Sequence, residues 1–364
     1  MSGPNPLLAP AGPDDPRTLA AVSLDEMAPV AREHLHPAAW DYVDGGAWDE
    51  ITLAENVAAW RTVRLRPRVL VDVSRVDART TFLGGATALP IATAPMAAHG
   101  LAHPDGEIAT ARAAAAAGIP FTLSTMSSRS IEEVAVAVPD ATRWFQLYAQ
   151  ADAGRSRELV GRAADAGYRA LMLTVDLPVL GYRPRDLRNS FDLSVPLGNL
   201  PERAVGTLGG ATLPTLTWSD VDEIRGWSAL PLVLKGILTA EDARLAVAHG
   251  VAGLVVSNHG GRQLDRSVTG LRAVPEVLAA VDGRCEVWVD GGVRRGLDVA
   301  IACALGARGV LLGRPLLWGI AGAGEAGAAR VLSILREELD RAMALLGAPR
   351  VADLAPSMVL LPGG

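Results

Sequence analysis

The chain has 364 residues, a formal net charge of −6 and only 4% aromatic residues. This length suits one large α/β domain or two small ones. The acidic balance, with no basic segment interleaved with aromatic residues, argues against a nucleic-acid-binding protein. No apolar run reaches the roughly 18 residues that a membrane-spanning helix needs, so we expect no membrane association.

The N-terminal segment is rich in proline and glycine and lacks the charged and apolar regions of a signal peptide. We expect a disordered arm over residues 1–21 and a single domain over residues 22–364. Cys285 and Cys303 have no CxxC partner, which argues against a disulfide framework and against a zinc site. We therefore expect reduced thiols, a cytoplasmic location and no metal.

The domain is expected to begin with helices. Ser23 followed by Glu26 predicts a capping box at the start of a first helix that continues to residue 43. After Gly45 and Gly46, the stretch DEITLAENVAAW predicts a second helix.

From Pro90 onward, short apolar runs alternate with polar turns and alanine-rich helical patterns. This alternation predicts parallel strands joined by right-handed helical crossovers. Eight such units match an α/β fold of the TIM-barrel type, a (β/α)8 barrel. The eight predicted strands are Ile91–Ala94, Phe121–Leu123, Trp144–Leu147, Leu171–Val175, Leu232–Leu234, Leu254–Val256, Val287–Val289 and Val310–Leu312.

The connection after the fourth strand, about residues 184–218, is long and has no clear periodicity. Long connections in compact domains are usually functional loops or disordered segments. We interpret this one as a mobile lid over the barrel mouth; a disordered insertion is the alternative.

Polar, charged or glycine residues follow nearly every predicted strand. Because barrel enzymes build their active sites from these strand ends, the ring of such residues predicts a site there. The ring comprises Pro95, Met96, Ala97, Ser124, Gln146, Tyr148, Thr174, Asp176, Lys235, Ser257, His259, Asp290, Gly291, Gly292, Gly313 and Arg314.

The last two strand ends, VDGGVRRG and VLLGRP, add Arg294 and Arg314 to glycine-rich turns. Barrels commonly bind phosphate at these two loops, so we predict a phosphate site. Tight turns with solvated arginines are the alternative. Lys235 either neutralises negative charge that develops on a ligand or forms a structural ion pair.

The stretch SNHGGRQLD after the sixth strand places His259 close to Arg262. Histidine suits a general base because its unperturbed pKa lies near 6.5. Arginine suits a carboxylate ligand because its planar group donates two parallel hydrogen bonds. Asp176 is the candidate that orients His259 and stabilises its charged form.

These motifs resemble those of the FMN-dependent α-hydroxy acid oxidases and dehydrogenases, the family of glycolate oxidase, lactate oxidase and mandelate dehydrogenase. The resemblance covers about residues 23–350 and includes WFQLY, LTVDLPVLGYRPRD, LVLKGI and SNHGGRQLD. It implies that His259 is the base and Asp176 its partner, that Arg262, Tyr42 and Arg183 bind the substrate carboxylate, and that Tyr148 bonds the substrate oxygen.

The resemblance also implies an FMN site. The residues expected to surround FMN are Ala94, Pro95, Met96, Ala97, Ser124, Gln146, Thr174, Lys235, Ser257, Asp290, Gly291, Gly292, Arg294, Gly313 and Arg314. The implied reaction oxidises an L-2-hydroxy acid to the 2-oxo acid, and dioxygen or another acceptor reoxidises the flavin, giving hydrogen peroxide in the case of dioxygen. The resemblance further suggests a homo-oligomer, a tetramer or an octamer.

Met126 and Leu180 are assigned to the substrate pocket. Met126 stands where glycolate oxidase-like members carry a bulky aromatic residue, and methionine adapts to irregular space. We therefore expect a substrate side chain larger than that of glycolate. The alternative is a tailoring oxidase that acts on a larger carboxylate-bearing natural product, amino acid or peptide. The His259 and Arg262 pair argues against a non-oxidising FMN barrel such as the flavin-dependent isopentenyl diphosphate isomerase. A non-catalytic phosphate-binding barrel is a further alternative.

Overall fold

A computed structural model describes residues 7, 14–191, 193, 195–200 and 213–362. Its centre is a sheet of eight parallel strands in the order β4-β11-β10-β9-β8-β7-β6-β5. The sheet closes into a barrel where the backbone N–H of Thr93 in β4 bonds the carbonyl of Pro120 just before β5. The predicted eight-stranded barrel is therefore confirmed. The strands are β4 (Ile91–Thr93), β5 (Phe121–Ser124), β6 (Arg143–Leu147), β7 (Ala170–Thr174), β8 (Leu232–Ile237), β9 (Gly253–Val256), β10 (Glu286–Val289) and β11 (Gly309–Leu312).

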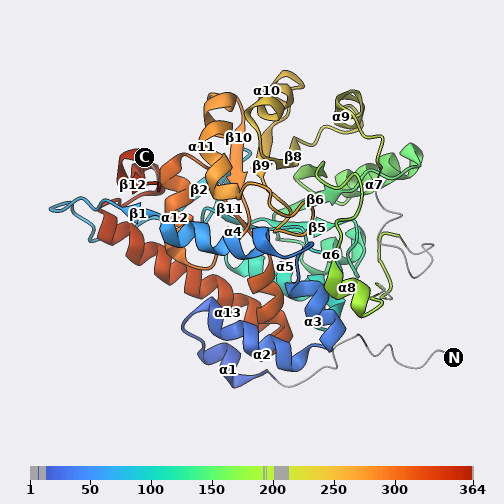
Figure 1. Cartoon of the computed structure of the whole chain (residues 1–364), viewed down its shortest axis with the longest axis horizontal. Coiled ribbons are helices and arrows are strands. Elements are labelled where there is room, and N and C mark those ends of the chain that lie inside the picture. The colour runs from blue at the N-terminus through green and yellow to red at the C-terminus, as the bar shows by residue number, and fades with distance from the viewer. Residues whose placement is uncertain (1–6, 8–13, 192, 194, 201–212, 363–364) are drawn as a thin grey trace.

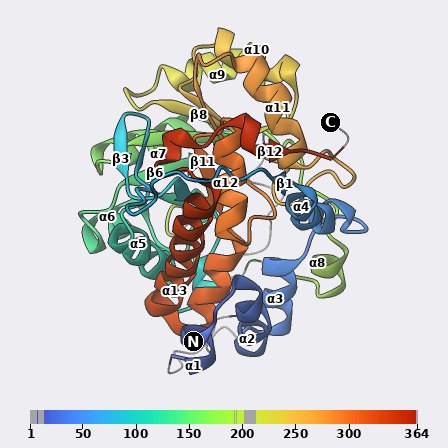
Figure 2. The same cartoon turned by 90° about the vertical axis from the view of Figure 1, so that its left-hand side faces the viewer.

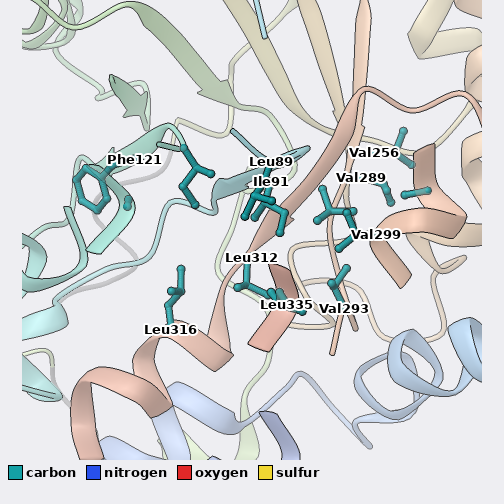
Figure 3. Packing of buried hydrophobic residues seen from close by; sticks show 14 of the residues in the cluster. Leu89, Ile91, Phe121, Val256, Val289, Val293, Val299, Leu312, Leu316 and Leu335 are labelled. Atoms are coloured by element: carbon teal, nitrogen blue, oxygen red, sulfur yellow. The ribbon is translucent and has the colours of Figure 1, made fainter. Parts of the chain in front are cut away.

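Helices surround the barrel, and α13 is the longest of the helices described (Figures 1 and 2). The strands read as continuous apolar runs because both faces are buried, one in the barrel and one under the helices. Side chains such as Ile91, Val289 and Leu312 meet Leu316 and Leu335 of α13 between the two layers (Figure 3). The surrounding helices are α5 (Glu107–Ala116), α6 (Ile131–Ala137), α7 (Ala153–Asp165), α9 (Trp218–Arg225), α10 (Ala240–Ala248), α11 (Gly270–Val281), α12 (Gly296–Leu305) and α13 (Arg314–Leu346).

Aromatic side chains fill the barrel interior near the N-terminal ends of its strands. Trp144 and Trp288 meet edge to face at 5.6 Å, and Phe82 contacts both rings. Phe82 belongs to a hairpin formed by β2 (Thr80–Phe82) and β3 (Gly85–Thr87). Gly253 faces Trp288 so closely that a Cβ would lie 2.4 Å from the indole ring. This end of the barrel is therefore closed by tightly packed side chains.

The N-terminal helices differ from the prediction at two points. A short helix, α1 (Pro16–Ala20), begins inside the segment predicted to be disordered, and Asp15 caps it by accepting from the N–H of Arg17. The prediction of disorder is therefore wrong for residues 15–20, because this helix packs on α13, where Thr18 fills the space beside Gly322. Residues 1–6 and 8–13 lie outside the described part.

The predicted first long helix is divided in two, and one further helix follows it. Pro37 begins a new helix after an extended Leu35, because proline fits the first helical turn but disfavours helix in the residue before it. Ser23 donates to the Glu26 carboxylate instead of capping a backbone N–H, so the predicted capping box does not form. The elements here are η1 (Leu24–Glu26), α2 (Met27–His34), α3 (Pro37–Asp44) and α4 (Ile51–Thr62), and the smaller ones elsewhere are β1 (Arg64–Leu65), η2 (His99–Leu101), η4 (Val351–Asp353), η5 (Pro356–Met358) and β12 (Val359–Leu360).

The predicted lid is described only in part, since residues 192, 194 and 201–212 lie outside the described residues. It begins with α8 (Pro184–Arg188), which lies beside α3 (Figure 1). Residues 195–200 are packed onto the barrel, with Leu197, Asn199 and Leu200 buried. This part of the insertion therefore does not behave as a loop projecting into solvent. Among the helices described, none is both long and apolar enough to cross a membrane.

Candidate active site

A cavity of about 1130 Å³, including the space open to solvent, lies at the C-terminal ends of the barrel strands. Most of the predicted site residues line it. These are Tyr42, Ala94, Pro95, Met96, Ala97, Met126, Tyr148, Leu180, Arg183, Lys235, His259, Arg262, Asp290, Gly291, Gly292, Arg294, Gly313 and Arg314. Five predicted residues lie outside the lining, namely Ser124, Gln146, Thr174, Asp176 and Ser257.

His259 stands at the cavity wall with a carboxylate behind it. Its Nδ1 lies 2.8 Å from Oδ1 of Asp176, and its Nε2 lies 3.4 Å from the hydroxyl of Tyr148. The residue has a left-handed backbone with φ of 58°, a conformation in which non-glycine residues need local support. Its own N–H supplies support by donating to Oγ of Ser257 at 3.1 Å.

Burial favours a neutral imidazole at His259, and the contact of Nδ1 with Asp176 leaves Nε2 as the free nitrogen. Burial lowers the pKa of His259 below 6.5, although Asp176 acts in the opposite direction. Burial tends to raise the pKa of Asp176, but the contact with His259 and the charge of Lys235 hold it below its usual range. An ionised Asp176 accepts the Nδ1 proton, which leaves Nε2 as the basic atom. Burial raises the pKa of Tyr148, so its hydroxyl remains a donor.

Arg262 and Tyr42 form a second wall of the cavity. The guanidinium lies over the Tyr42 ring at 5.0 Å and donates to the carbonyls of Tyr42 and Gly45 at 2.6 and 2.8 Å. Phe191 stacks on Tyr42, with the two ring centroids 4.6 Å apart. Arg183 approaches from the start of α8 and donates to the Arg262 carbonyl. These contacts join the loop after β9 to α3 and α8.

The glycines of SNHGGRQLD allow this close approach. Gly261 has φ of 74°, and a Cβ on it would lie 2.6 Å from the backbone nitrogen of Leu53 in α4. Gly260 has φ of 65° and accepts from Arg314 at 3.0 Å. A side chain at either position would be strained in this backbone conformation, so the loop can turn His259 and Arg262 into one cavity only with glycine between them.

Arg294 and Arg314 follow the last two strands of the barrel. Arg314 donates to the carbonyls of Val43, Gly45 and Gly260, while Arg294 lies over the Trp318 ring at 4.7 Å. Both side chains are therefore held by protein groups rather than solvated. The alternative of tight turns with solvated arginines does not fit these positions.

Lys235 projects from β8 between Ser257 and Asp290, two of the predicted site residues. Its Nζ donates to Oγ of Ser257 at 3.1 Å and lies 3.5 Å from Oδ2 of Asp290. The other oxygen of Asp290 is buried without a hydrogen-bond partner. Lys235 thus forms an ion pair and also lines the cavity, so the two readings of its role are compatible.

Three further predicted residues form a buried chain at the ends of β5, β6 and β7. Ser124 donates to Oε1 of Gln146 at 3.0 Å, and Nε2 of Gln146 donates to Oγ1 of Thr174 at 3.0 Å. The chain fixes the orientation of the Gln146 amide. In this arrangement the three side chains support the cavity floor without lining it.

Positive charge dominates the cavity. Its lining holds five cationic side chains, Arg183, Lys235, Arg262, Arg294 and Arg314, against one carboxylate, Asp290. Burial, together with neighbouring arginines, lowers the pKa of Arg183 to about 10 and that of Arg314 to about 9. The cations therefore destabilise one another, and anionic ligands would relieve the repulsion. In the described residues no group of three or more His, Cys, Asp or Glu is placed to hold a metal ion.

Residues 31–361 match the profile of the family described as FMN-dependent dehydrogenase. L-lactate oxidase of Nostoc sp. is 49% identical over 86% of this chain and 90% of its own length. 2-Hydroxyacid oxidase 2 of Rattus norvegicus is 47% identical over 85% of this chain and 90% of its own length. Glycolate oxidase 1 of Zea mays is 46% identical, with coverages of 85% and 88%.

Solved structures agree with the sequence relatives. A crystal structure of mandelate oxidase with (S)-4-hydroxymandelic acid is 44% identical, has a TM-score of 0.86 and is matched over 91% of this chain and 97% of that one. The chain belongs to the FMN-dependent dehydrogenase family. Within it, the protein is an FMN-dependent 2-hydroxy acid oxidase.

The site suits FMN on the chemistry of its donors. A phosphate group would find Arg294, Arg314 and the positive-φ turn at Gly291 and Gly292 on one side of the cavity. Lys235 would stand where it can balance negative charge on the reduced ring system. The surplus of cations in the lining is the observation that favours a phosphorylated cofactor together with a carboxylate substrate.

The sequence did not indicate the residues that shape the phosphate-side turn. Trp60 Nε1 in α4 donates to the carbonyl of Gly291 at 2.8 Å, and a Cβ on Gly292 would lie 1.9 Å from the carbonyl oxygen of Asn56. The amide of Asn56 also pairs with that of Asn258 in both directions. Only a helical periodicity marks α4 in the sequence, so no pattern there indicated this contact.

Proposed function

We propose that the protein oxidises an L-2-hydroxy acid to the 2-oxo acid with His259 as the base. The observation that carries this proposal is a single cavity lined by His259, the arginines and Tyr42, with Asp176 bonded to His259 from behind the lining. When bound, FMN accepts two electrons from the substrate and passes them to dioxygen, which yields hydrogen peroxide.

His259 Nε2 takes a proton from the substrate. As the imidazole becomes charged, Asp176 at 2.8 Å from Nδ1 stabilises it. Burial, with smaller contributions from the charges of Lys235 and Arg183, lowers the pKa of His259 and so keeps the free imidazole neutral before substrate binds. The Tyr148 hydroxyl, 3.4 Å from Nε2, donates to the substrate oxygen.

The arginines bind the substrate carboxylate. Arg262 is fixed by two carbonyls and by the Tyr42 ring, so one edge of its guanidinium is left for a bidentate contact. Arg183 adds a second cation on the same side of the cavity. Tyr42 limits the rotation of Arg262 and contributes its hydroxyl. Fixed positions of this kind reduce the entropy lost when substrate is oriented.

Part of the cavity lining is apolar. Met126, Leu177 and Leu180 line it. This lining supports a substrate side chain larger than that of glycolate, aryl or long aliphatic. A solved mandelate oxidase structure holds (S)-4-hydroxymandelic acid, an aryl 2-hydroxy acid, in keeping with such a substrate.

A peroxide assay across a panel of 2-hydroxy acids tests the proposal. We expect an aryl or long aliphatic L-acid to give the highest kcat/KM, and glycolate as the best substrate would contradict the pocket assignment. We also expect the His259→Ala variant to retain FMN while losing nearly all flavin reduction under anaerobic conditions. If lactate, mandelate and related acids all leave the wild-type flavin oxidised, the substrate is a larger carboxylate-bearing molecule.

We also propose that the protein is a homo-oligomer, a tetramer or an octamer. Val69, Leu70 and Val71 form an exposed apolar segment with Leu70 fully exposed, and such segments often mark association surfaces. Light scattering of the purified holoenzyme gives the mass directly, and a monomer would contradict the proposal. The cytoplasm is the proposed location, supported by the unpaired Cys285 and Cys303.

A further inference from the structure

The insertion after β7 contacts the loop between β5 and α6 through one buried amide. Asn199 is 0% exposed and has hydrogen bonds at both ends of its side chain. Its Oδ1 accepts from the N–H of Ile131 at 2.9 Å, and its Nδ2 donates to Oγ of Ser127 at 2.9 Å and to the Ser124 carbonyl at 3.4 Å. One side chain thus contacts both ends of the loop between β5 and α6.

The residue before it strengthens the same contact. The N–H of Gly198 donates to the carbonyl of Ser127 at 3.0 Å. A Cβ on Gly198 would lie 2.2 Å from the nitrogen of Ser130, so only glycine permits this distance. The insertion and the loop therefore touch backbone to backbone.

The loop that Asn199 contacts carries Met126. The Met126 N–H donates to Oγ of Ser124 at 3.1 Å, and the Met126 carbonyl accepts from the N–H of Ala98 at 3.0 Å. Met126 itself lines the cavity, together with the arginines. Asn199 does not line the cavity, so any effect on the substrate must pass through this loop.

We propose that Asn199 is a positioning residue for substrate specificity, which holds the Met126 wall in place by binding the Ser124–Ile131 loop to the insertion. This inference rests on the proposed function, since it assigns the side-chain pocket of the 2-hydroxy acid to Met126. A fixed wall contacts a large substrate side chain but not the small one of glycolate. Specificity for the side chain is therefore set partly by a residue outside the pocket.

The test uses the full-length holoenzyme and two variants with a matched control. Asn199→Ala removes all three contacts, and Ser127→Ala removes one of them in case the first variant folds poorly. Asn189→Ala is the control, because Asn189 belongs to the same insertion but contacts only the exposed Asp41 carboxylate through its side chain. Kinetics are measured with mandelate and glycolate in peroxide assays.

We expect Asn199→Ala to lower the ratio of kcat/KM for mandelate over glycolate about 10-fold, within the range that apolar pocket contacts supply. The change should lie in KM for mandelate, while kcat and flavin content stay near wild type because the base and the arginines are untouched. Ser127→Ala should change the ratio in the same direction by less, and Asn189→Ala should leave it unchanged. An equal loss on both substrates would show a merely structural role and overturn the proposal.

Hydrogen exchange supplies a readout that does not depend on turnover. In Asn199→Ala we expect faster exchange at Ile131, which loses its acceptor, and also at Met126 and Ala98, whose bonds report the position of Met126. Faster exchange confined to Ile131 would overturn the proposal. If the wild type oxidises none of the acids, the proposed function fails, yet the exchange at Met126 and Ala98 still decides whether Asn199 positions this wall.

Discussion

Replacement of Asp176 by asparagine tests the base assignment most directly. Asparagine matches the shape of aspartate and can still accept from Nδ1 of His259, so the change removes the charge and little else. The cost can be worked from the 2.8 Å contact between Nδ1 and Oδ1. Unit charges about 4 Å apart at an effective dielectric constant of about 20 interact by roughly 4 kcal/mol, which corresponds to about a 10³-fold rate factor.

We expect Asp176→Asn to slow flavin reduction by about 10²- to 10³-fold. The effect should lie somewhat below the full 10³-fold factor because the charge of Lys235 partly offsets that of Asp176. The pH profile should change as well. The neutral imidazole is the active form, so the rate rises with pH through the pKa of His259. Since Asp176 raises that pKa against the effect of burial, its loss shifts the rise to lower pH while the plateau falls.

Anaerobic stopped-flow measurement of flavin bleaching across pH gives both quantities. Asp152→Asn, at an exposed helix cap, controls for the loss of one carboxylate. A plateau within about threefold of wild type, with normal flavin content, would refute the idea that Asp176 stabilises charge on His259.

Four further outcomes are expected. Arg262→Lys should raise KM by about 10- to 100-fold with a smaller change in kcat, because lysine cannot make a bidentate contact while also bonding the Tyr42 carbonyl; an unchanged KM would contradict it. Arg314→Ala should lower the flavin-to-protein absorbance ratio after dialysis, and full retention would count against the phosphate site. Met126→Trp should lower kcat/KM for mandelate and leave kcat/KM for glycolate unchanged, as measured in steady-state assays. Burial raises the pKa of Asp298 to about 6, so the folded state loses stability as pH rises from about 4 to 6. Asp298→Asn should therefore raise Tm at pH 7 but not at pH 4. Equal Tm values for the variant and the wild type at pH 7 would refute this reasoning.

The barrel could be predicted because parallel strands buried on both faces must be continuous apolar runs. The same pattern predicted three site residues, because a polar residue at or just after the end of an apolar run is conspicuous in the sequence. These residues are His259, Lys235 and Asp290. Their mutual distances could not be predicted. The Lys235 to Asp290 contact depends on how β8, β9 and β10 are staggered, and the sequence contains no direct measure of that stagger.

Residues contributed by other elements were harder to predict. Tyr42 lies in a helix that precedes the barrel, and only the family resemblance indicated it. Its position depends on contacts with Arg262 and Phe191, which are far away in the sequence. The packing of Asn199 was missed because the insertion has no periodicity, and its buried amide forms bonds to loop atoms rather than to a regular element.

The aromatic packing of Phe82, Trp144 and Trp288 has a kinetic consequence. In the part of the chain that the structure describes, these rings seal one end of the barrel, so the hydroxy acid cannot enter, nor the oxo acid leave, through it. Both molecules must use the same mouth and, carrying the same carboxylate, the same arginines. The oxo acid therefore competes with each new substrate molecule for one entrance, and accumulated product slows the enzyme in a way that more substrate overcomes.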